Sequence, residues 1–206
     1  MIRFAACLAA ALAVAACTST YVSPVEVTRF VGDSPARLGS GTIAVRAAPG
    51  RTGDSLEFAA YQQAVAAELA RLGYRVVPAE AAQSQVPGTS AGQVAELRVN
   101  RTIEPPGGER SPVNVGVGAA TGSYGSGVGL GVGIDLGAAR PRDVVDTEMG
   151  LIIRDNATGA ALWEGRARFS ASASSDFADL QASAARLARA MFSAFPGESG
   201  ETIEVE

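Results

Sequence analysis

The chain has 206 residues, of which 47% are hydrophobic and 18% are charged, which is enough for one globular domain in addition to a leader. It contains no His and no Lys, so the commonest general base, the commonest metal ligand and the lysine of a Walker loop are all missing. The formal net charge is −4 and the sequence has no basic run, which argues against a nucleic-acid partner.

Residues 1–16 read MIRFAACLAAALAVAA, a positive residue followed by an apolar run and small residues, as in a secretory signal peptide. The apolar run is too short to cross about 30 Å of membrane hydrocarbon. The stretch VAAC, which ends at Cys17, resembles a bacterial lipobox. That resemblance implies cleavage before Cys17 and its acylation with fatty acids such as palmitate, which would give stable membrane anchoring. The alternative is a plain secreted protein whose Cys happens to follow two alanines.

Two features favour the lipoprotein interpretation. Cys17 would be the only Cys of the mature chain, because Cys7 lies inside the apolar run, so no disulfide partner exists. The residue after Cys17 is Thr18, and in lipoproteins of this kind the lack of Asp at that place favours the outer membrane, with the domain facing the periplasm. Residues 17–40 are expected to be the lipidated Cys and a tether, within which the alternation VEVTRFV is compatible with a strand.

Two amphipathic helices are predicted. Asp54 and Glu57 form a capping pair, after which apolar residues recur at helical spacing until Gly73, which suits the left-handed residue after a helix. A second stripe begins near Asp176 and ends before Pro196-Gly197. The two stripes are Phe58, Tyr61, Val65, Leu69 and Leu72 in the first helix, and Phe177, Leu180, Ala184, Leu187, Met191 and Phe195 in the second.

Strands are predicted between and around these helices. The candidates are residues 41–47, 74–78, 94–103, 143–155, 160–171 and 202–206, and the pair flanking DNATG is expected to form a tight hairpin. This order predicts an α+β fold, with one antiparallel sheet and both helices packed on one of its faces. Residues 41–206 are expected to form this single domain.

The segment 111–137 contains VNVGVGAATGSYGSGVGLGVGID, in which apolar residues and glycines alternate. No glycine triplet has the spacing of a dinucleotide fingerprint, and glycine at half the positions disfavours a helix. The alternation predicts a hairpin with one apolar face and one glycine face. Three alternatives stay open for this segment: a hairpin that extends the sheet under the helices or projects as a mobile extension, a hairpin whose apolar face meets lipid, and a disordered linker.

The lipobox, the stretches DSLEFAAYQQAVAAELARLGYRV and LIIRDNATGAALWEGRA, and the ending AMFSAFPGESGETIEVE together resemble the bacterial lipoproteins defined by domain of unknown function 4136 (DUF4136). The likeness covers about residues 40–206. The helix ending in GY and the pattern FPG-x-S-G-x-T carry most of it. The resemblance implies an envelope lipoprotein with a small α/β domain, and it brings no catalytic residues.

Few residues are candidates for chemistry. Asp143, Asp146 and Glu148 lie close in the sequence, and a pair of such acids could act on a glycoside; the simpler interpretation is a solvated strand entry beside arginines. Trp163, the lone Trp, is expected to pack in the core, with ligand stacking as the alternative. The sequence GESG, residues 197–200, only approaches a nucleophile elbow because Glu201 replaces its last glycine.

We therefore expect a lipid-anchored protein of the cell envelope that acts as a non-enzymatic accessory or interaction module, without cofactor, metal or catalytic residues. Its partner would be the membrane, through Cys17, and another envelope protein or further copies of the chain. One alternative is a subunit of an oligomeric outer-membrane export pore that uses the Gly-rich hairpin. A weaker alternative is a carbohydrate-acting enzyme that uses the three acids named above.

Overall fold

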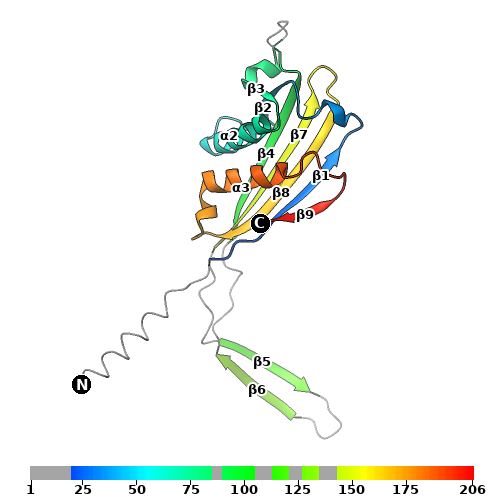
Figure 1. The fold of residues 1–206 in the computed structure, drawn as a ribbon. Helices are drawn as coiled ribbons and strands as arrows, with labels where there is room; N and C mark the ends of the chain where they lie inside the picture. Colours follow the sequence, from blue (N-terminus) through cyan, green and yellow to red (C-terminus); the bar gives the residue numbers. More distant parts are fainter. Residues whose placement is uncertain (1–19, 85–89, 105–112, 121–126, 135–142) are drawn as a thin grey trace, which may run out of the picture.

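The computed structural model describes residues 20–84, 90–104, 113–120, 127–134 and 143–206. A seven-stranded sheet has the order β3-β2-β4-β7-β8-β1-β9, and helices α2 and α3 cover one of its faces (Figure 1), so the predicted α+β class is confirmed. The strands are β1 (Val25–Val31), β2 (Thr42–Ala47), β3 (Arg75–Val77), β4 (Gln93–Glu104), β5 (Val113–Ala120), β6 (Gly127–Ile134), β7 (Val144–Asp155), β8 (Ala161–Ser172) and β9 (Thr202–Val205). The helices are α2 (Leu56–Arg71) and α3 (Leu180–Phe192), with short 3-10 helices η2 (Pro35–Arg37), η3 (Ala79–Ala82) and η4 (Asp176–Ala178).

The sheet is mixed, which refines the prediction of an antiparallel one. Strand β2 pairs in parallel with both β3 and β4, while all other pairings in this sheet are antiparallel. The cause is the connection between β2 and β3, because α2 returns the chain along the sheet before β3 begins, and parallel neighbours need such a crossover.

The ordered domain begins before the predicted boundary at residue 41. The segment predicted as a tether contributes β1, which lies between β8 and β9 and pairs antiparallel with both. Val25 and Val27 are fully buried, and buried residues alternate with less buried ones from Val25 to Phe30, as the alternation of VEVTRFV predicts. The strand forms because β8 and β9 pair with its two edges, while α3 packs on the side that carries the two valines.

Both helices form, with starts that differ from the predicted ones. Ser55, not the Asp54–Glu57 pair, caps α2 by accepting the backbone N–H of Phe58 at 3.0 Å. The second helix begins only at Leu180, because Asp179 accepts backbone N–H groups at its first turn and the preceding residues form η4. Gly73 has a φ of +102°, as expected for the residue that ends α2.

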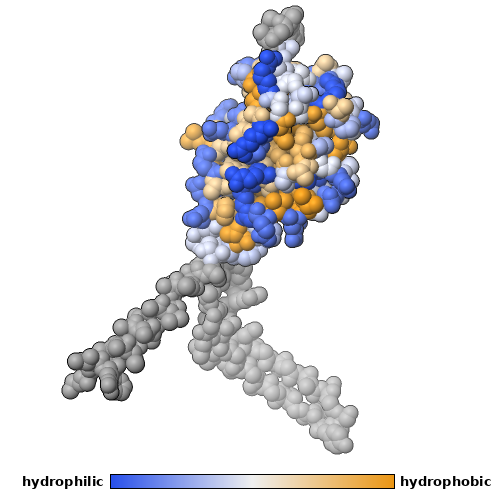
Figure 2. All heavy atoms as spheres, in the orientation of Figure 1, coloured by the Kyte–Doolittle hydropathy of each residue, from blue (hydrophilic) through white to orange (hydrophobic). Residues whose placement is uncertain are grey.

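The hydrophobic core lies between the helices and the sheet. Most residues of the predicted helical stripes face it, and Tyr61, Val65, Leu69, Leu187 and Met191 are all fully buried. Phe177, predicted as part of the second stripe, instead lies in η4 and is exposed. Tyr61 also joins the two helices, because its hydroxyl and that of Ser183 form a hydrogen bond of 3.0 Å. Figure 2, which looks onto the helical layer, shows hydrophilic side chains on the outer side of the domain with apolar surface between them.

The predicted Gly-rich hairpin is confirmed, and it forms a two-stranded sheet of its own from β5 and β6. The hairpin does not pair with the main sheet, in which β4 pairs directly with β7 along their whole lengths, so it is an extension separate from that sheet. Within the hairpin, Val115 pairs with Val132 and Gly116 with Gly131. The predicted apolar and glycine faces concern side chains that lie outside the described part of the structure.

Candidate functional surfaces

The chain enters and leaves the domain repeatedly at one end of the sheet, which we call the hairpin end and define by Tyr21, Glu104, Val144 and Ser172. Glu104 pairs with Val144, and Val144 pairs with Ser172. The backbone N–H of Ser172 donates to the Tyr21 carbonyl (2.9 Å), and the backbone N–H of Tyr21 donates to Ser172 Oγ (3.2 Å). Tyr21 and the residues on either side of segment 105–142, Glu104 and Val144 among them, therefore lie together at this end.

Large apolar side chains are exposed at the hairpin end. Tyr21 is 56% exposed, Ile103 is 63% exposed and Phe177, in η4, is 37% exposed. Arg101 ties η4 to the end of β4, because its guanidinium donates to the Ala178 carbonyl. The other exposed large apolar side chains of the described residues, Phe30 and Leu56, lie elsewhere, on the open side of β1 and at the start of α2.

Arg186 of α3 holds two parts of the hairpin end in place. Its guanidinium carbon lies 4.6 Å from the ring centroid of Phe177 and 5.1 Å from that of Phe169. Its Nη2 donates to the Ser23 carbonyl at 3.1 Å, and its Nη1 is buried without a hydrogen-bond partner. Cation–π contacts with the two phenylalanine rings stabilise the guanidinium and offset the missing hydrogen bond of Nη1. One arginine thus fixes both the N-terminal segment and the exposed Phe177 ring.

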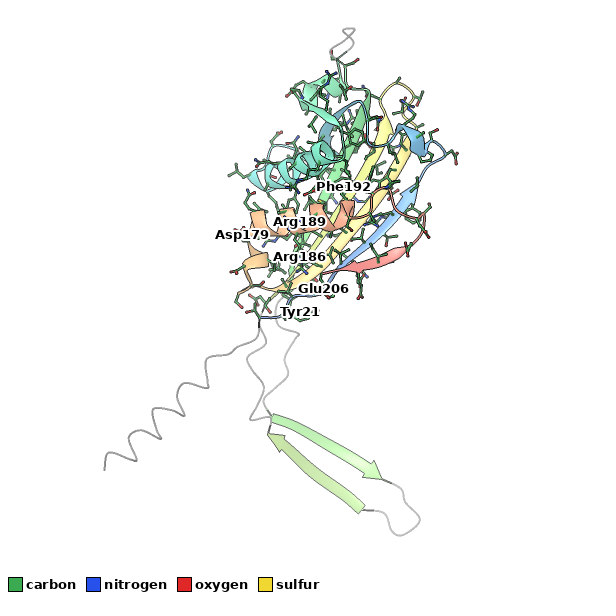
Figure 3. The ribbon with its side chains drawn as sticks, in the orientation of Figure 1. Tyr21, Asp179, Arg186, Arg189, Phe192 and Glu206 are labelled. Carbon is green, nitrogen blue, oxygen red and sulfur yellow. The ribbon has the colours of Figure 1, made fainter. Side chains whose placement is uncertain are left out.

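A groove of about 530 Å³ lies beside α3, between this helix and the end of β9. Apolar side chains from three parts of the chain line it, together with two arginines and one acid. The lining residues are Val22, Phe177, Ala182, Ala185, Arg186, Arg189, Ala190, Val205 and Glu206. Figure 3 shows Arg186 and Arg189 on α3, with Glu206 and Tyr21 nearer the hairpin end.

The second face of the sheet carries charged side chains and no long helix, and we call it the open face. Of the elements that the structure describes, η3 packs on a corner of this face, over Ala44 and Val94. Arg46 and Arg154 both bind the nearly buried Glu96, at 2.8 and 3.0 Å. Burial alone would raise the pKa of Glu96, but the hydrogen bonds from the two arginines outweigh that effect and lower its pKa.

Next to the hairpin end, the open face has a groove of about 420 Å³, which we call the acidic groove. The predicted acids Asp146 and Glu148 both line it, whereas Asp143, the residue before β7, does not. Sequence reasoning missed Glu26 and Glu204, which come from β1 and β9 and join the same groove around Arg168. The strand register explains this, because it places Glu148, Arg168, Glu26 and Glu204 in one row across the sheet.

Two carboxylates of the acidic groove are hydrogen-bonded. Asp146 accepts a hydrogen bond from the hydroxyl of Ser170, and Glu26 accepts one from Arg168 Nε at 2.7 Å. The walls of the groove belong to the open face of the sheet. Among the residues that the structure describes, no group of three or more His, Cys, Asp or Glu side chains could hold a metal ion.

The lone Trp is a core residue, as predicted. Trp163 is 1% exposed, stacks on Phe192 with centroids 5.7 Å apart, and contacts Phe195 at 5.3 Å. Its Nε1 donates to the Pro196 carbonyl at 2.9 Å. Gly165 makes room for the ring, since a Cβ there would lie 2.2 Å from it. The FPG sequence therefore serves to hold the Trp in the core.

The residues after FPG fasten β9 to β1. Ser199 Oγ accepts the Val31 backbone N–H at 3.1 Å and so joins the C-terminal segment to the end of β1. The backbone N–H of Gly200, a residue with a φ of +84°, donates to the Arg29 carbonyl at 2.7 Å. The hydroxyls of Thr28 and Thr202 form a hydrogen bond of 2.8 Å between the two strands.

Arg29 is a buried charge on the helix side of β1, and its exposed fraction is 3%. Its Nε donates to the Met191 carbonyl (3.1 Å), and its Nη2 donates to the Ala190 carbonyl (3.2 Å) and to Ser193 Oγ (3.1 Å). Burial lowers the pKa of Arg29, and the charge of Glu201 opposes this effect. The guanidinium thus satisfies carbonyls at the C-terminus of α3, where the helix dipole favours a cation.

Within the described residues, neither helix is both long and apolar enough to pass through a membrane. No curated protein matches the sequence. Among solved structures, the PelC dodecamer from Paraburkholderia phytofirmans is 17% identical, with a TM-score of 0.43 over 82% of this chain and 94% of that chain. A PDZ domain protein from Parabacteroides distasonis is 15% identical, with a TM-score of 0.49 over 96% of this chain and 42% of that chain.

A family model described as a domain of unknown function (DUF4136) matches residues 41–197 of the chain. The match spans α2, the whole of β2 to β8 and α3, and ends within the FPG sequence. The helix ending in GY and the FPG sequence, on which the sequence resemblance rested, both lie within it. The chain belongs to the DUF4136 family.

Proposed function

We propose that this protein is a lipid-anchored interaction module of the cell envelope, held by acylated Cys17 at the outer membrane, facing the periplasm and without enzymatic activity. The observation that carries the proposal is the position of the hairpin end. Tyr21, only four residues after Cys17, is hydrogen-bonded to Ser172 there. An anchor at Cys17 would therefore hold one defined end of the domain near the membrane and leave the opposite end and the open face accessible.

The open face supports the binding part of the proposal. Charged side chains stand in rows across four neighbouring strands, and the acidic groove interrupts them beside the hairpin end. Such a surface suits a partner with a complementary basic or polar face, because charged rows fix orientation and exclude partners of like charge. We infer an envelope protein as the partner.

The direct test combines labelling with purification. The full chain, expressed with a fatty-acid analogue, should incorporate the label, and Cys17→Ala should abolish it. Cys7→Ala is the matched control and should leave the label unchanged. The lipidated protein, purified in mild detergent, should then retain a distinct envelope protein. Undiminished labelling of Cys17→Ala would rule out the anchor, and a protein that carries no partner at native expression levels would rule out the module.

One observation favours a second candidate, a subunit of an oligomeric export pore. β5 and β6 pair as a hairpin apart from the main sheet, in a segment whose sequence alternates apolar residues with glycine, and a membrane strand needs an apolar side toward lipid. A pore subunit should form rings in detergent and lose them when Gly129 and Gly131 are changed to Asp. The control is Ala157→Asp, which adds a charge in the exposed turn between β7 and β8. An interaction module should keep its mass in all three forms.

A further inference from the structure

The hairpin end exposes large apolar side chains, of the kind that proteins present to membrane surfaces. A lipid anchor at Cys17 does not by itself require them. Tyr21, Ile103 and Phe177 are the exposed large apolar residues there, and they come from three distant parts of the chain. A tyrosine ring, apolar with one polar edge, favours the zone between lipid headgroups and acyl chains, and the side chains of Ile103 and Phe177 are wholly apolar. We propose that the hairpin end is a membrane-docking surface, which rests on the phospholipid leaflet that holds Cys17.

The length of the chain before the domain limits what can cover this surface. Tyr21 lies four residues after Cys17, so the acylated residue is at most about 14 Å from the hairpin end. A domain on so short a tether cannot move far from the leaflet. The exposed rings therefore meet the headgroup layer at high effective concentration, and weak apolar contacts are enough to hold them there.

The docking residues are fixed in position before they meet lipid. Phe177 lies against the guanidinium of Arg186, which also holds the carbonyl of Ser23, two residues after Tyr21. Arg101 holds the carbonyl of Ala178, the next residue after Phe177. Because these contacts already order the segments that carry the rings, docking requires little further loss of conformational freedom.

Charge plays a minor part in this docking. The groove beside α3 presents Arg186 and Arg189 but also Glu206, while Asp143, Asp176 and Asp179 lie around the hairpin end. Arginines can meet lipid phosphates, and the carboxylates can meet the ammonium of a zwitterionic headgroup. Docking on a phosphatidylethanolamine leaflet should therefore persist at high salt, in contrast to proteins that bind through a basic patch.

The orientation that follows also places the Gly-rich segment. Val113 is nine residues after Glu104, so the hairpin begins within about 30 Å of the docked surface. The strands of the main sheet would point away from the leaflet. The turn between β7 and β8 would then be the most distant part, because a strand of twelve residues spans about 40 Å.

A pair of single-cysteine variants tests the orientation, and the test rests on the proposed anchor. Ser174 and Ala157 are exposed residues at opposite ends of β7 and β8. The full lipidated chain with Ser174→Cys or Ala157→Cys is labelled with a fluorophore and reconstituted into phosphatidylethanolamine–phosphatidylglycerol vesicles that contain a headgroup-nitroxide lipid. The probe at residue 174 should lose most of its emission at both low and high salt, and the probe at residue 157 should lose none.

The same assay identifies the residues that dock. Adding Tyr21→Ser and Phe177→Ser to the Ser174→Cys form should remove most of the quenching, whereas Phe30→Ser, a change of an equally exposed ring elsewhere, should not. Equal quenching at residues 174 and 157 would overturn the proposal. A second result would also overturn the proposal: the fluorescence of the probe at residue 174 is quenched neither by iodide in the water nor by nitroxide lipid. In that case protein, and not lipid, covers the surface.

Failure of the anchor gives a different result from failure of docking. If Cys17 is not acylated, its free thiol takes up the fluorophore in the unmutated chain and the protein does not float with the vesicles. If docking alone fails, the protein floats with unlabelled Cys17 and the two probes behave alike. Arg186→Met should weaken quenching at residue 174 while the protein still floats, because the ring of Phe177 would lose its support.

Discussion

In β8, Trp163, Ala167 and Phe169 face the helices and are buried, whereas the residues between them, Glu164, Arg166 and Arg168, face the open side of the same sheet. The two sides of one strand thus belong to different parts of the molecule. The helix side holds the fold together, and it is also where the FPG sequence makes its contacts. The open side is available to partners.

The contrast between the two sides of the sheet shows that residues typical of a family need not belong to a functional site. In this chain the FPG sequence accepts the Trp163 indole, and the following Ser and Gly join β9 to β1. Each of these contacts fixes the C-terminal segment to the sheet. Residues that decide what the protein binds should instead be sought on the open face and at the hairpin end, where substitutions disturb the fold least.

The largest effect should come from the helix side. Trp163→Ala should lower the free energy of unfolding by about 3–5 kcal/mol, because it removes a fully buried ring and leaves a cavity beside Phe192 and Phe195. Phe30→Ala, on the open side of β1, should cost less than about 1 kcal/mol because that ring is 45% exposed. Urea unfolding followed by circular dichroism measures both values. Equal losses would contradict the division between the two sides.

The second effect concerns the buried charge. Arg29→Met should destabilise the protein by about 2–3 kcal/mol, because the carbonyls of Ala190 and Met191 lose a charged donor inside the domain. Arg166→Met is the matched change on the open side, where Arg166 binds only Glu164 in an exposed pair, and it should cost about 0.5 kcal/mol or less. Thermal unfolding of both variants measures the difference. A stable Arg29→Met protein would show that the helix end tolerates unsatisfied carbonyls.

Sequence periodicity predicted the elements well where one side of a segment is buried by its neighbours. The stripes of α2 and α3 and the pair β7–β8 follow directly from apolar spacing. The parallel position of β3 was missed, because a strand of three residues has too little pattern to show its direction. The place of β1 was left open, since its alternation becomes meaningful only when β8 and β9 lie on either side.

The candidate sites were predictable only in part, for a related reason. Asp146 and Glu148 lie two residues apart, so their common face could be read from one strand. Glu26 and Glu204 reach the same groove through pairings between distant segments, which local patterns do not contain. The hairpin end depends in the same way on contacts such as that of Tyr21 with Ser172, residues 151 positions apart.

A smaller effect should appear at acid pH and concerns the turn between β7 and β8. Hydrogen bonds from the side chain and backbone of Thr158, together with Arg37, lower the pKa of Asp155 to about 2. A carboxyl with a lowered pKa stabilises the fold above its ordinary pKa, and that contribution disappears as pH falls from about 4 to about 2. Asp155→Asn should therefore cost about 1–2 kcal/mol at pH 7 and lose much of this difference near pH 2. A constant difference from pH 7 to pH 2 would contradict the assignment.

The smallest effect on stability, and the most informative for function, is expected in the acidic groove. Glu148→Gln should change the free energy of unfolding by about 0.5 kcal/mol or less, because Glu148 is exposed on the open side of β7. The same change should nevertheless weaken retention of the envelope partner, since it removes one charge from the row that contains Arg168, Glu26 and Glu204. Glu57→Gln, an exposed change in the first turn of α2, should leave retention unchanged. Pull-down with the lipidated proteins measures how much partner each variant retains. A loss of partner with Glu148→Gln alone would place the binding site in the acidic groove. Equal retention by both variants would show that the partner binds elsewhere.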